Sequence, residues 1–592
     1  MNSRTFLLRL LAASLIWMAP EAAFAKMSIV YSKHNLSVTG PGQIKALNET
    51  RVCIFCHTPH NATPSTPLWN KDLNPFTYTL YDSSTLKSIP SQPTGPSRLC
   101  LSCHDGTVAL GKTLGGDIPT NMELAGRPSD LGTDLSDDHP ISFSFYAAQP
   151  NEELTSTPPA KLLFYGTDFK VECSTCHDPH DDTNGMFLRV DNSYSALCTC
   201  CHVKKGWEGS SHRTSGKAWN GLDPNPWPHT KWSTVGENGC EGCHTPHNAG
   251  GPKRLVNDLS EEDNCYPCHN GNVASLDIQA QFRKLSHHRV EDTTIGVTGN
   301  AHDPTEPPTM VKGHVECVDC HNPHAVNSRS ASAPDVSGRL DLVSGVDQNG
   351  IAASTAAYEY EICYKCHADS NEVAPHVNRV INETNFRRKF DPINPSYHPV
   401  VSIGKNSMVP SIPSILAPSL TTSSMIYCTD CHDSDESPAV GGSGPRGPHG
   451  SIYSPILRER YETADGTLES YDNYALCYRC HNRQSILADQ SFQKKSFGKT
   501  ASRGGHSGHL AAGAPCSACH DPHGVQSVSF TGDHTKLINF DTLIAQPAAG
   551  QTVPLFSDKG SNAGSCTLVC HGITHTPGYT GTDPNTVDST YP

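Results

Sequence analysis

The chain has 592 residues, a formal charge of −15 and a mean hydropathy of −0.44. Only 36% of its residues are hydrophobic, and it contains 47 glycines and 45 prolines, whereas typical globular domains are about 45–50% apolar. The acidic balance argues against a nucleic-acid-binding protein, which needs a basic surface. Side chains this polar cannot offset the ordering entropy of the chain by themselves. Either much of the chain is disordered, or something other than side chains fills its core.

Residues 1–25 are expected to be a secretory signal peptide. They hold two arginines, an apolar run over residues 10–18 and a final Ala-Phe-Ala that fits a cleavage site. The apolar run is shorter than the ~20 residues that a membrane-spanning helix needs. We therefore expect an exported protein, located in the periplasm, on the outer-membrane surface or outside the cell.

Cysteine pairs followed directly by histidine recur along the rest of the chain. Eleven have the pattern Cys-x-x-Cys-His, and a twelfth, "CTLVCH", has one additional residue between its cysteines. In chain order these sites, numbered 1 to 12 below, use Cys53 and Cys56, Cys100 and Cys103, Cys173 and Cys176, Cys198 and Cys201, Cys240 and Cys243, Cys265 and Cys268, Cys317 and Cys320, Cys363 and Cys366, Cys428 and Cys431, Cys477 and Cys480, Cys516 and Cys519, and Cys566 and Cys570. Cys200 is left over, and the pattern gives it no role.

Covalent haem explains this pattern better than a disulfide scaffold or a series of zinc sites. Disulfides are common in exported chains but do not need a following histidine. Structural zinc takes four closed ligands, commonly from two separated pairs. In c-type haem attachment, two thioether bonds hold the porphyrin and the adjacent histidine reaches the iron. We therefore predict twelve covalently bound haem c groups, with the proximal ligands His57, His104, His177, His202, His244, His269, His321, His367, His432, His481, His520 and His571.

Twelve macrocycles would fill the core that the side chains cannot. We predict a mostly irregular fold with short α-helices around the haem sites and few short strands, in an elongated, haem-cored chain of six haem pairs. Short apolar segments at 186–190, 254–256, 339–343, 454–461 and 536–540 are expected to be short strands or extended clips. The predicted boundaries are 1–25 for the signal peptide, 26–135, 136–215, 216–285, 286–395 and 396–500 for pairs 1 to 5, and 501–592 for pair 6 with a loose C-terminal tail.

A second histidine follows the motif histidine by three residues at the odd-numbered sites, except site 9. These histidines end the tails "TPH", "DPH", "TPH", "NPH" and "DPH", and they are His60, His180, His247, His324 and His523. At site 9 we expect His449, in "GPHGS", to replace the missing one. Because proline turns the chain away from its own haem, this second histidine is expected to cap the iron of a neighbouring haem. The other predicted distal ligands are His34, His139, His288, His314, His398 and His509, with His212, His229, His287, His302, His376, His506, His534 and His575 in reserve.

The tandem "CxxCHxPH … CxxCH" pattern resembles the doubled-CXXCH cytochromes, which are exported multihaem c-type cytochromes of metal-reducing bacteria. The resemblance runs from "CIFCHTPHNA" through "CLSCHDGTVALG" and "DDHPISFSF" to "CSACHDPHG" and "CTLVCHG", nearly the whole length after residue 25. It implies bis-histidine, low-spin haems in a continuous chain that moves electrons across the periplasm, through porin-held conduits or to minerals outside the cell. This chain departs from the pattern at site 9, at site 12 and at Cys200.

Three functions fit these features. We expect an electron carrier rather than an enzyme, and its expected partners are redox partner cytochromes, an outer-membrane porin, further copies in a filament, and a ferric oxide or other extracellular acceptor. The second function is a multihaem reductase with one open iron that acts on a small oxyanion; the surplus of histidines and the absence of a Cys-x-x-Cys-Lys variant argue against it. The third is a filament subunit, in which a histidine such as His34 or His575 would cap a haem of the next chain.

Overall fold

The computed structural model describes residues 28–63, 67–73, 75–148, 152–222, 224–291, 315–369, 375–412, 420–493 and 504–591. The expected signal peptide and the expected ligand His314 lie outside these residues. The chain divides into an N-terminal unit, Met1–Val203 with Thr245–Leu255, and a C-terminal unit, Lys204–His244 with Val256–Pro592. The boundaries of the six haem pairs stay a prediction.

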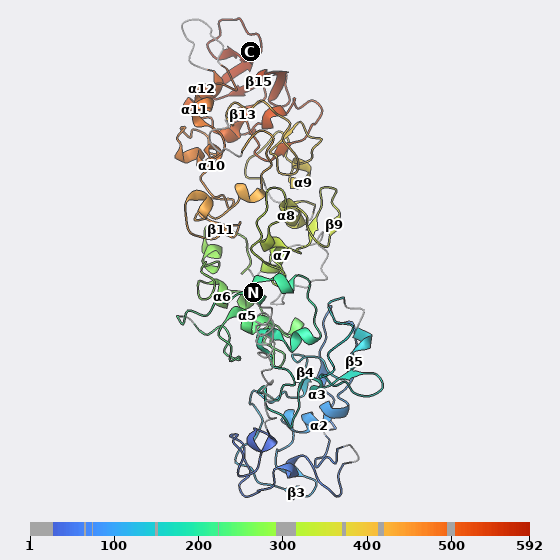
Figure 1. Ribbon diagram of the computed structural model, residues 1–592. Helices are drawn as coiled ribbons and strands as arrows, with labels where there is room; N and C mark the ends of the chain where they lie inside the picture. The colour runs from blue at the N-terminus through green and yellow to red at the C-terminus, as the bar shows by residue number, and fades with distance from the viewer. Residues whose placement is uncertain are drawn as a thin grey trace, which may run out of the picture. The chain divides into compact units, whose positions relative to one another are not determined.

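A short helix lies at each of the eleven Cys-x-x-Cys-His motifs. Further short helices lie between the motifs, and most of the described chain is irregular (Figure 1). This confirms the predicted fold class. The α-helices of the described residues are α2 (Gly95–His104), α3 (Cys173–Cys176), α4 (Ser211–Thr214), α5 (Val235–Asn238), α6 (Tyr266–His269), α7 (Cys317–Cys320), α8 (Glu359–His367), α9 (Phe386–Lys389), α10 (Ala475–Tyr478), α11 (Arg483–Leu487) and α12 (Gly505–Ala511). The 3-10 helices at the remaining Cys-x-x-Cys-His motifs are η2 (Cys53–Phe55), η5 (Cys198–Cys200), η7 (Gly239–Gly242), η12 (Cys428–Asp430) and η16 (Cys516–Ala518).

The strands of the described chain are few-residue segments except near its C-terminal end. They are β1 (Thr79–Leu80), β2 (Lys112–Thr113), β3 (Gly116–Asp117), β4 (Asp134–Leu135), β5 (Phe143–Ser144), β6 (Lys170–Val171), β7 (Ser286–His287), β8 (Gly345–Val346), β9 (Ala352–Ala353), β10 (Ser396–Tyr397), β11 (Gly450–Ser451), β12 (Gly524–Val525), β13 (Ala545–Gln546), β14 (Leu555–Gly560), β15 (Ala563–Cys570), β16 (Ile573–Thr576), β17 (Thr586–Asp588) and β18 (Thr590–Tyr591). β1 to β12 form two-stranded ladders: β1 with β4, β2 with β3, β5 with β6, β7 with β11, β8 with β9 and β10 with β12.

The C-terminal segment forms a six-stranded sheet instead of the loose tail that we expected. Its order is β13-β15-β16-β17, and β14 and β18 also pair with β15. β15 contains both cysteines of site 12, so this site lies on a strand and not on a helical turn. Phe556, Leu568 and Tyr591 from the sheet pack with Phe540 and Ala545 in one buried cluster.

Four of the predicted apolar clips fold back onto a motif histidine. Single β-bridges join His177 to Leu188, His244 to Val256, His432 to Leu457 and His520 to Ile538, and the same kind of bridge joins His57 to Trp69. The clips are therefore isolated bridges rather than strands. Each holds the backbone of a motif histidine in a fixed place.

Side chains alone form only small buried clusters in the described residues. The largest contains Val346, Tyr360, Tyr364, Ala368, Phe390, Tyr397 and Val400, with the site 9 cysteine Cys428 packed against it. No described helix is both long enough and apolar enough to cross a membrane.

Candidate haem centres

A helical turn brings the three residues of each Cys-x-x-Cys-His motif together. At site 7, the His321 backbone N–H donates to the Cys317 carbonyl at 2.9 Å, and the same bond recurs from His57 to Cys53 at 2.9 Å and from His520 to Cys516 at 3.0 Å. Residues three and four apart lie on one face of such a turn. The two thiols and the imidazole therefore face the same side, as attachment to one porphyrin requires.

Each of the eleven motif histidines, at sites 1 to 11, faces a second histidine across a nearly constant gap. The ring centroids are 6.1 to 6.4 Å apart, while the interplanar angles range from 8° to 79°. In site order these imidazole pairs are His57 with His180, His104 with His34, His177 with His247, His202 with His139, His244 with His324, His269 with His212, His321 with His449, His367 with His288, His432 with His523, His481 with His398 and His520 with His506. Both members of every pair belong to the same unit.

This separation fits an iron atom between the two rings. A metal about 2.0 Å from each nitrogen, with each centroid about 1.15 Å beyond its nitrogen, puts the centroids about 6.3 Å apart. Direct stacking or edge contact would couple the distance to the ring angle. A constant centroid distance with widely varying ring angles indicates that the same atom separates the rings in every pair. Two imidazoles on opposite sides of one metal ion can each rotate about the metal–nitrogen bond, so their ring angle is not fixed.

Hydrogen bonds at Nδ1 leave Nε2 as the inward-facing nitrogen. The Nδ1–H groups of His57, His177 and His432 donate to the carbonyls of Pro67, Met186 and Pro455, at 2.8, 2.9 and 3.0 Å. His321 and His520 donate in the same way to Arg339 and Lys536, both at 3.0 Å. Met186, Pro455 and Lys536 lie in bridged clips, and Pro67 lies two residues before the bridged Trp69. Arg339 lies in the 339–343 segment, for which the described residues show no such bridge. The clips thus fix the tautomer as well as the ring orientation, which is the usual second-shell requirement of a metal-binding histidine.

Each Pro-His dipeptide that follows an odd-numbered site from site 3 onward contacts two imidazole pairs, one through its histidine ring and one through its proline carbonyl. The histidine faces the motif histidine of the preceding odd site: His180 faces His57, and His324 faces His244. The proline carbonyl accepts from the distal histidine of the even site between them, as Pro179 does from His34 at 3.3 Å and Pro323 from His212 at 2.9 Å. Pro448 and Pro522 accept in the same way from His288 and His398, and Pro246 accepts from the backbone N–H of His139.

Burial favours the neutral form of nine of these imidazoles, which is the form that binds a metal. Desolvation is the largest cause, and it lowers the pKa of His177, His269, His367, His432, His481 and His520 to about 4. The pKa falls to about 4 at His34 and to about 3 at His449 and His506, again mainly through burial. At neutral pH these rings carry a free Nε2 lone pair.

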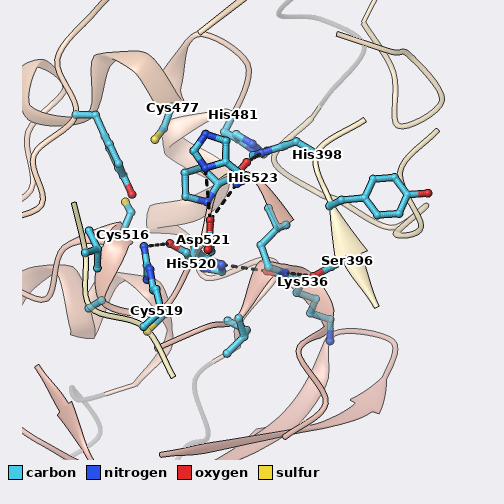
Figure 2. Close-up of a pocket in the computed structure, with 18 of the residues that line it drawn as sticks. Ser396, His398, Cys477, His481, Cys516, Cys519, His520, Asp521, His523 and Lys536 are labelled. Carbon is cyan, nitrogen blue, oxygen red and sulfur yellow. Dashed lines mark hydrogen bonds and ion pairs between the residues drawn. The ribbon is translucent and has the colours of Figure 1, made fainter. Parts of the chain in front are cut away.

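A cavity of about 2520 Å³ in the C-terminal unit is lined by residues of sites 7 to 12. Cavities that bind one drug-sized ligand span about 300–1,000 Å³, and close-packed interiors hold few voids larger than a water molecule. Figure 2 shows Cys477 and Cys516 on neighbouring segments of its wall, with His398, His481 and His523 gathered beside them. A space of this size and lining suits several macrocycles and not a single substrate.

Cysteines of consecutive sites approach one another in a regular alternation. Within a predicted pair, the second cysteines of the two sites lie near each other. At sites 1 and 2, burial is the main cause that raises the pKa of Cys56 to about 12, and the nearby Cys103 raises it further. Between pairs the first cysteines meet, as where Cys100 and Cys173 share a hydrogen bond that raises the pKa of Cys100. Second cysteines also interact in Cys176–Cys201, Cys243–Cys268, Cys320–Cys366, Cys431–Cys480 and Cys519–Cys566, and first cysteines in Cys265–Cys317, Cys363–Cys428 and Cys477–Cys516. In the N-terminal unit sites 1 to 4 therefore follow one another in chain order, and in the C-terminal unit sites 5 to 12 do.

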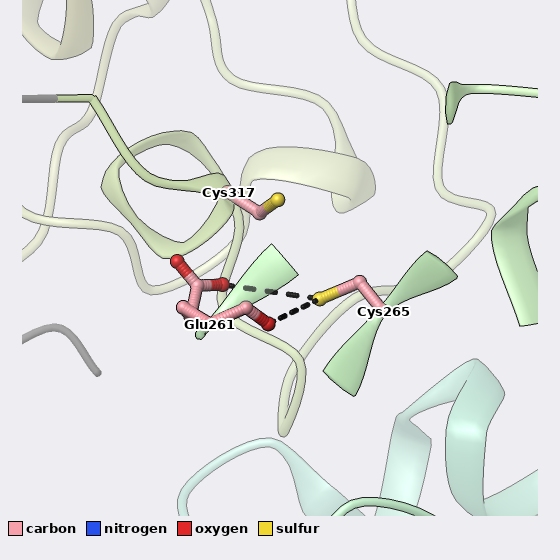
Figure 3. A group of neighbouring side chains, drawn as sticks. All are labelled: Glu261, Cys265 and Cys317. Carbon is pink, nitrogen blue, oxygen red and sulfur yellow. Dashed lines mark hydrogen bonds between the residues drawn. The ribbon is translucent and has the colours of Figure 1, made fainter. Parts of the chain in front are cut away.

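Glu261, Cys265 and Cys317 bring a carboxylate oxygen and two sulfur atoms within 4.8 Å of one another (Figure 3). This trio has the donor atoms of a small metal site. However, Cys265 and Cys317 are the first cysteines of sites 6 and 7, and thioether bonds would use both thiols. We interpret the cluster as the place where these two haem sites adjoin.

The predicted distal ligands differ in where the structure places them. His34, His139, His180, His247, His288, His324, His398, His449 and His523 each face a motif histidine. His60 does not: its side chain is exposed, and none of the imidazole pairs of the described residues includes it. The histidine of every other Pro-His dipeptide that follows an odd-numbered site faces the motif histidine of the preceding odd site, whereas His60 follows site 1, the first site in the sequence.

Sequence reasoning held His212 and His506 only in reserve, yet both face motif histidines. The signal for His212 was its position, upstream of site 6 as His34 and His139 are upstream of sites 2 and 4. His506 lies three residues before His509 on α12, one helical turn away. Four other reserves, His229, His287, His376 and His534, lie outside the imidazole pairs of the described chain, and His575 faces His509. His534, for example, is buried with hydrogen bonds to Thr531 and Ile538.

Two segments of the chain match the family model for the doubled CXXCH motif, residues 168–206 and 233–274. They contain sites 3 to 6. A search of curated proteins found no match to the chain. Together with the motifs, the family match indicates a multihaem c-type cytochrome, an electron carrier with covalently bound haem.

Proposed function

We propose that this multihaem cytochrome is an exported dodecahaem protein that carries electrons along a series of bis-histidine, low-spin haems. Haem iron supplies reversible one-electron chemistry, and the protein sets its potential through axial ligands, burial and hydrogen bonds. The observation that carries the proposal is the set of imidazole pairs. Eleven motif histidines each have a second imidazole at the distance that an iron between them needs.

The same pairs weigh against the two alternatives. A reductase of small oxyanions needs an iron with an open position, and a second histidine opposite the motif histidine closes that position. A filament built on shared ligands needs a haem that lacks a ligand within its own chain, and at sites 1 to 11 both histidines come from one chain. His34, named above as a possible donor to a second chain, faces His104 of its own chain.

We propose further that the acceptors are other cytochromes, a porin-held conduit or ferric oxides outside the cell. The support for this is the leader-like segment at residues 1–25 and the resemblance of the motifs to cytochromes of metal-reducing bacteria. Ligation by two histidines, without methionine, favours low potentials suited to such acceptors.

Reductive titration of the holoprotein tests the proposed function. We expect uptake of twelve electrons per chain, full reoxidation by a soluble ferric chelate and no steady turnover of nitrite, hydroxylamine or sulfite. Sustained reduction of any of these three small molecules would overturn the carrier assignment in favour of the reductase.

The thiol count of the holoprotein tests the haem number. Twenty-four of the 25 cysteines belong to the twelve sites, so only the Cys200 thiol should react with a thiol reagent after denaturation. Cys200 is half-buried, and its sulfur lies 3.2 Å from the Ala196 carbonyl, outside the attachment pattern. We expect one thiol per chain, and none in Cys200→Ser with an unchanged haem spectrum. Three or more thiols would mean that at least one site carries no haem.

A carboxylate at site 3 should lower the potential of one haem. His247 faces His177, and its Nδ1 lies 2.9 Å from Oδ1 of Asp138, whose side chain is only 5% exposed. Burial by itself lowers the pKa of His247. The hydrogen bond to Asp138 and the charge of that carboxylate raise it, and the net shift of the pKa is upward. A carboxylate on the outer nitrogen makes the imidazole a stronger donor to ferric iron.

Asp138→Asn should therefore raise the midpoint potential of a single haem in a spectroelectrochemical titration. A tenfold loss of preference for the ferric state corresponds to about 59 mV for a one-electron couple. The exposed Asp134 provides a control, because Asp134→Asn removes a nearby charge whose Oδ1 accepts a hydrogen bond from the backbone N–H of Ser136 and not from a histidine of the described residues. Equal shifts in both variants would assign the effect to charge alone and contradict a role for the hydrogen bond.

A further inference from the structure

Site 12 is built differently from the other eleven sites. Its cysteines lie on β15, where successive side chains point to opposite faces. Cys566, Leu568 and Cys570 therefore share one face, and all three pack in the buried cluster of the C-terminal sheet. The additional residue in "CTLVCH" gives the two cysteines this even spacing. The histidine that directly follows Cys570 then falls beyond the end of the strand.

His571 occupies the tight turn between β15 and β16. Its φ of 48° lies in the left-handed region, which turns the chain back on itself. Its side chain is about one-third exposed, and Nε2 lies 2.7 Å from Oδ1 of Asp465. The nitrogen that faces a partner imidazole elsewhere is thus engaged by a carboxylate at the surface.

His575 lies on the cysteine face instead. β16 runs antiparallel to β15, and His575 pairs directly with Leu568 in the register. Directly opposed residues project to the same side of a sheet, so the His575 ring lies on the side of Cys566 and Cys570. Burial is the main cause that lowers the pKa of His575 to about 4.

The partner of His575 is His509. Their ring centroids are 5.9 Å apart with an interplanar angle of 27°, close to the geometry of the other imidazole pairs. The Nδ1–H of His509 donates to the Gly505 carbonyl at 2.7 Å, which leaves Nε2 free. α12 also carries His506, the partner of the site 11 histidine His520. One helix thus carries both imidazoles, the one that faces His520 and the one that faces His575.

We propose that the haem attached to Cys566 and Cys570 is ligated by His575 and His509, and that His571, the histidine of the motif, is not a ligand. This inference rests on the proposed function, because it assumes a haem at site 12. It also corrects the sequence-based expectation for His571.

Single variants of the full-length holoprotein test the assignment, with electron paramagnetic resonance and magnetic circular dichroism as readouts. His575→Ala should convert one haem in twelve to a high-spin, cyanide-binding form, whereas His571→Ala and Asp465→Asn should convert none. The reverse result, a high-spin haem in His571→Ala and none in His575→Ala, would overturn the proposal.

A second substitution covers the case in which His575→Ala fails to mature. Methionine keeps an axial ligand and raises the potential of the haem that it ligates. His575→Met should raise the potential of one haem and add a methionine–iron charge-transfer band, while His571→Met should leave all potentials unchanged. A band in His571→Met alone would contradict the proposal.

Intact mass separates this inference from the function on which it rests. Twelve haems per chain with a spectroscopic change only in His571 variants would refute the ligand assignment and leave the electron-carrier function intact. Eleven haems, with none on the peptide that contains Cys566, would refute the premise itself.

Discussion

Replacing His180 with alanine is expected to convert one low-spin haem to a high-spin, cyanide-binding form, whereas replacing His60 with alanine changes none. Both histidines end the same local pattern, three residues after a motif histidine and directly after proline. The ring of His180 lies 6.1 Å from that of His57 and nearly parallel to it, while His60 lies outside the imidazole pairs of the described residues. Both histidines are exposed, so the imidazole pairing, and not burial, separates them. Loss of His180 removes a proposed ligand, whereas loss of His60 removes a histidine outside these pairs.

The spin state of the oxidised holoproteins, measured by electron paramagnetic resonance, checks this matched pair. His324→Ala extends it, because His324 faces His244 in the C-terminal unit with the same geometry. High-spin signals of equal size in His60→Ala and His180→Ala would contradict the rule that each Pro-His dipeptide serves the preceding pair. So would the absence of any high-spin signal in His180→Ala.

Chain produced without haem attachment is expected to be unfolded. The cavity in the C-terminal unit is about 2520 Å³. Its wall is mainly apolar, and without haem this surface would face water or empty space, whereas folded interiors are close-packed and bury their apolar surface. The cavity cannot stay open and empty, and the small side-chain clusters around it cannot hold the chain together.

Expression without the cytochrome c maturation machinery provides this apoprotein. We expect a far-ultraviolet circular dichroism spectrum of an unfolded chain, no cooperative thermal transition and rapid cleavage by protease, with the holoprotein as the folded control. An apoprotein that melts cooperatively would show that side chains suffice for the core.

Much of the site could be predicted because haem attachment is encoded locally. Two cysteines and a histidine on one helical turn are recognisable without tertiary information, and so is the Pro-His tail. Which motif histidine a second histidine faces is not encoded in the local sequence. His60 and His180 have the same immediate context, and only their place in the series of pairs separates them. His212 and His506 were undervalued because nothing in their own neighbourhoods distinguishes a ligand from a surface histidine.

The C-terminal sheet was missed for a related physical reason. "AGSCTLVC" alternates so that Cys566, Leu568 and Cys570 fall on one face, which is a strand pattern. We interpreted it as an attachment motif with one inserted residue. The attachment motif stays a prediction, and the strand decides which histidine lies on the cysteine face.

The most direct test of the central claim is the spin state of every iron in the air-oxidised, fully loaded protein. Quantitative electron paramagnetic resonance, with and without cyanide, counts high-spin and low-spin haems. We predict twelve low-spin haems per chain and no change with cyanide, because each iron has two imidazoles from its own chain. A high-spin haem that binds cyanide in the wild-type protein would contradict full bis-histidine ligation and reopen the possibility of a catalytic site.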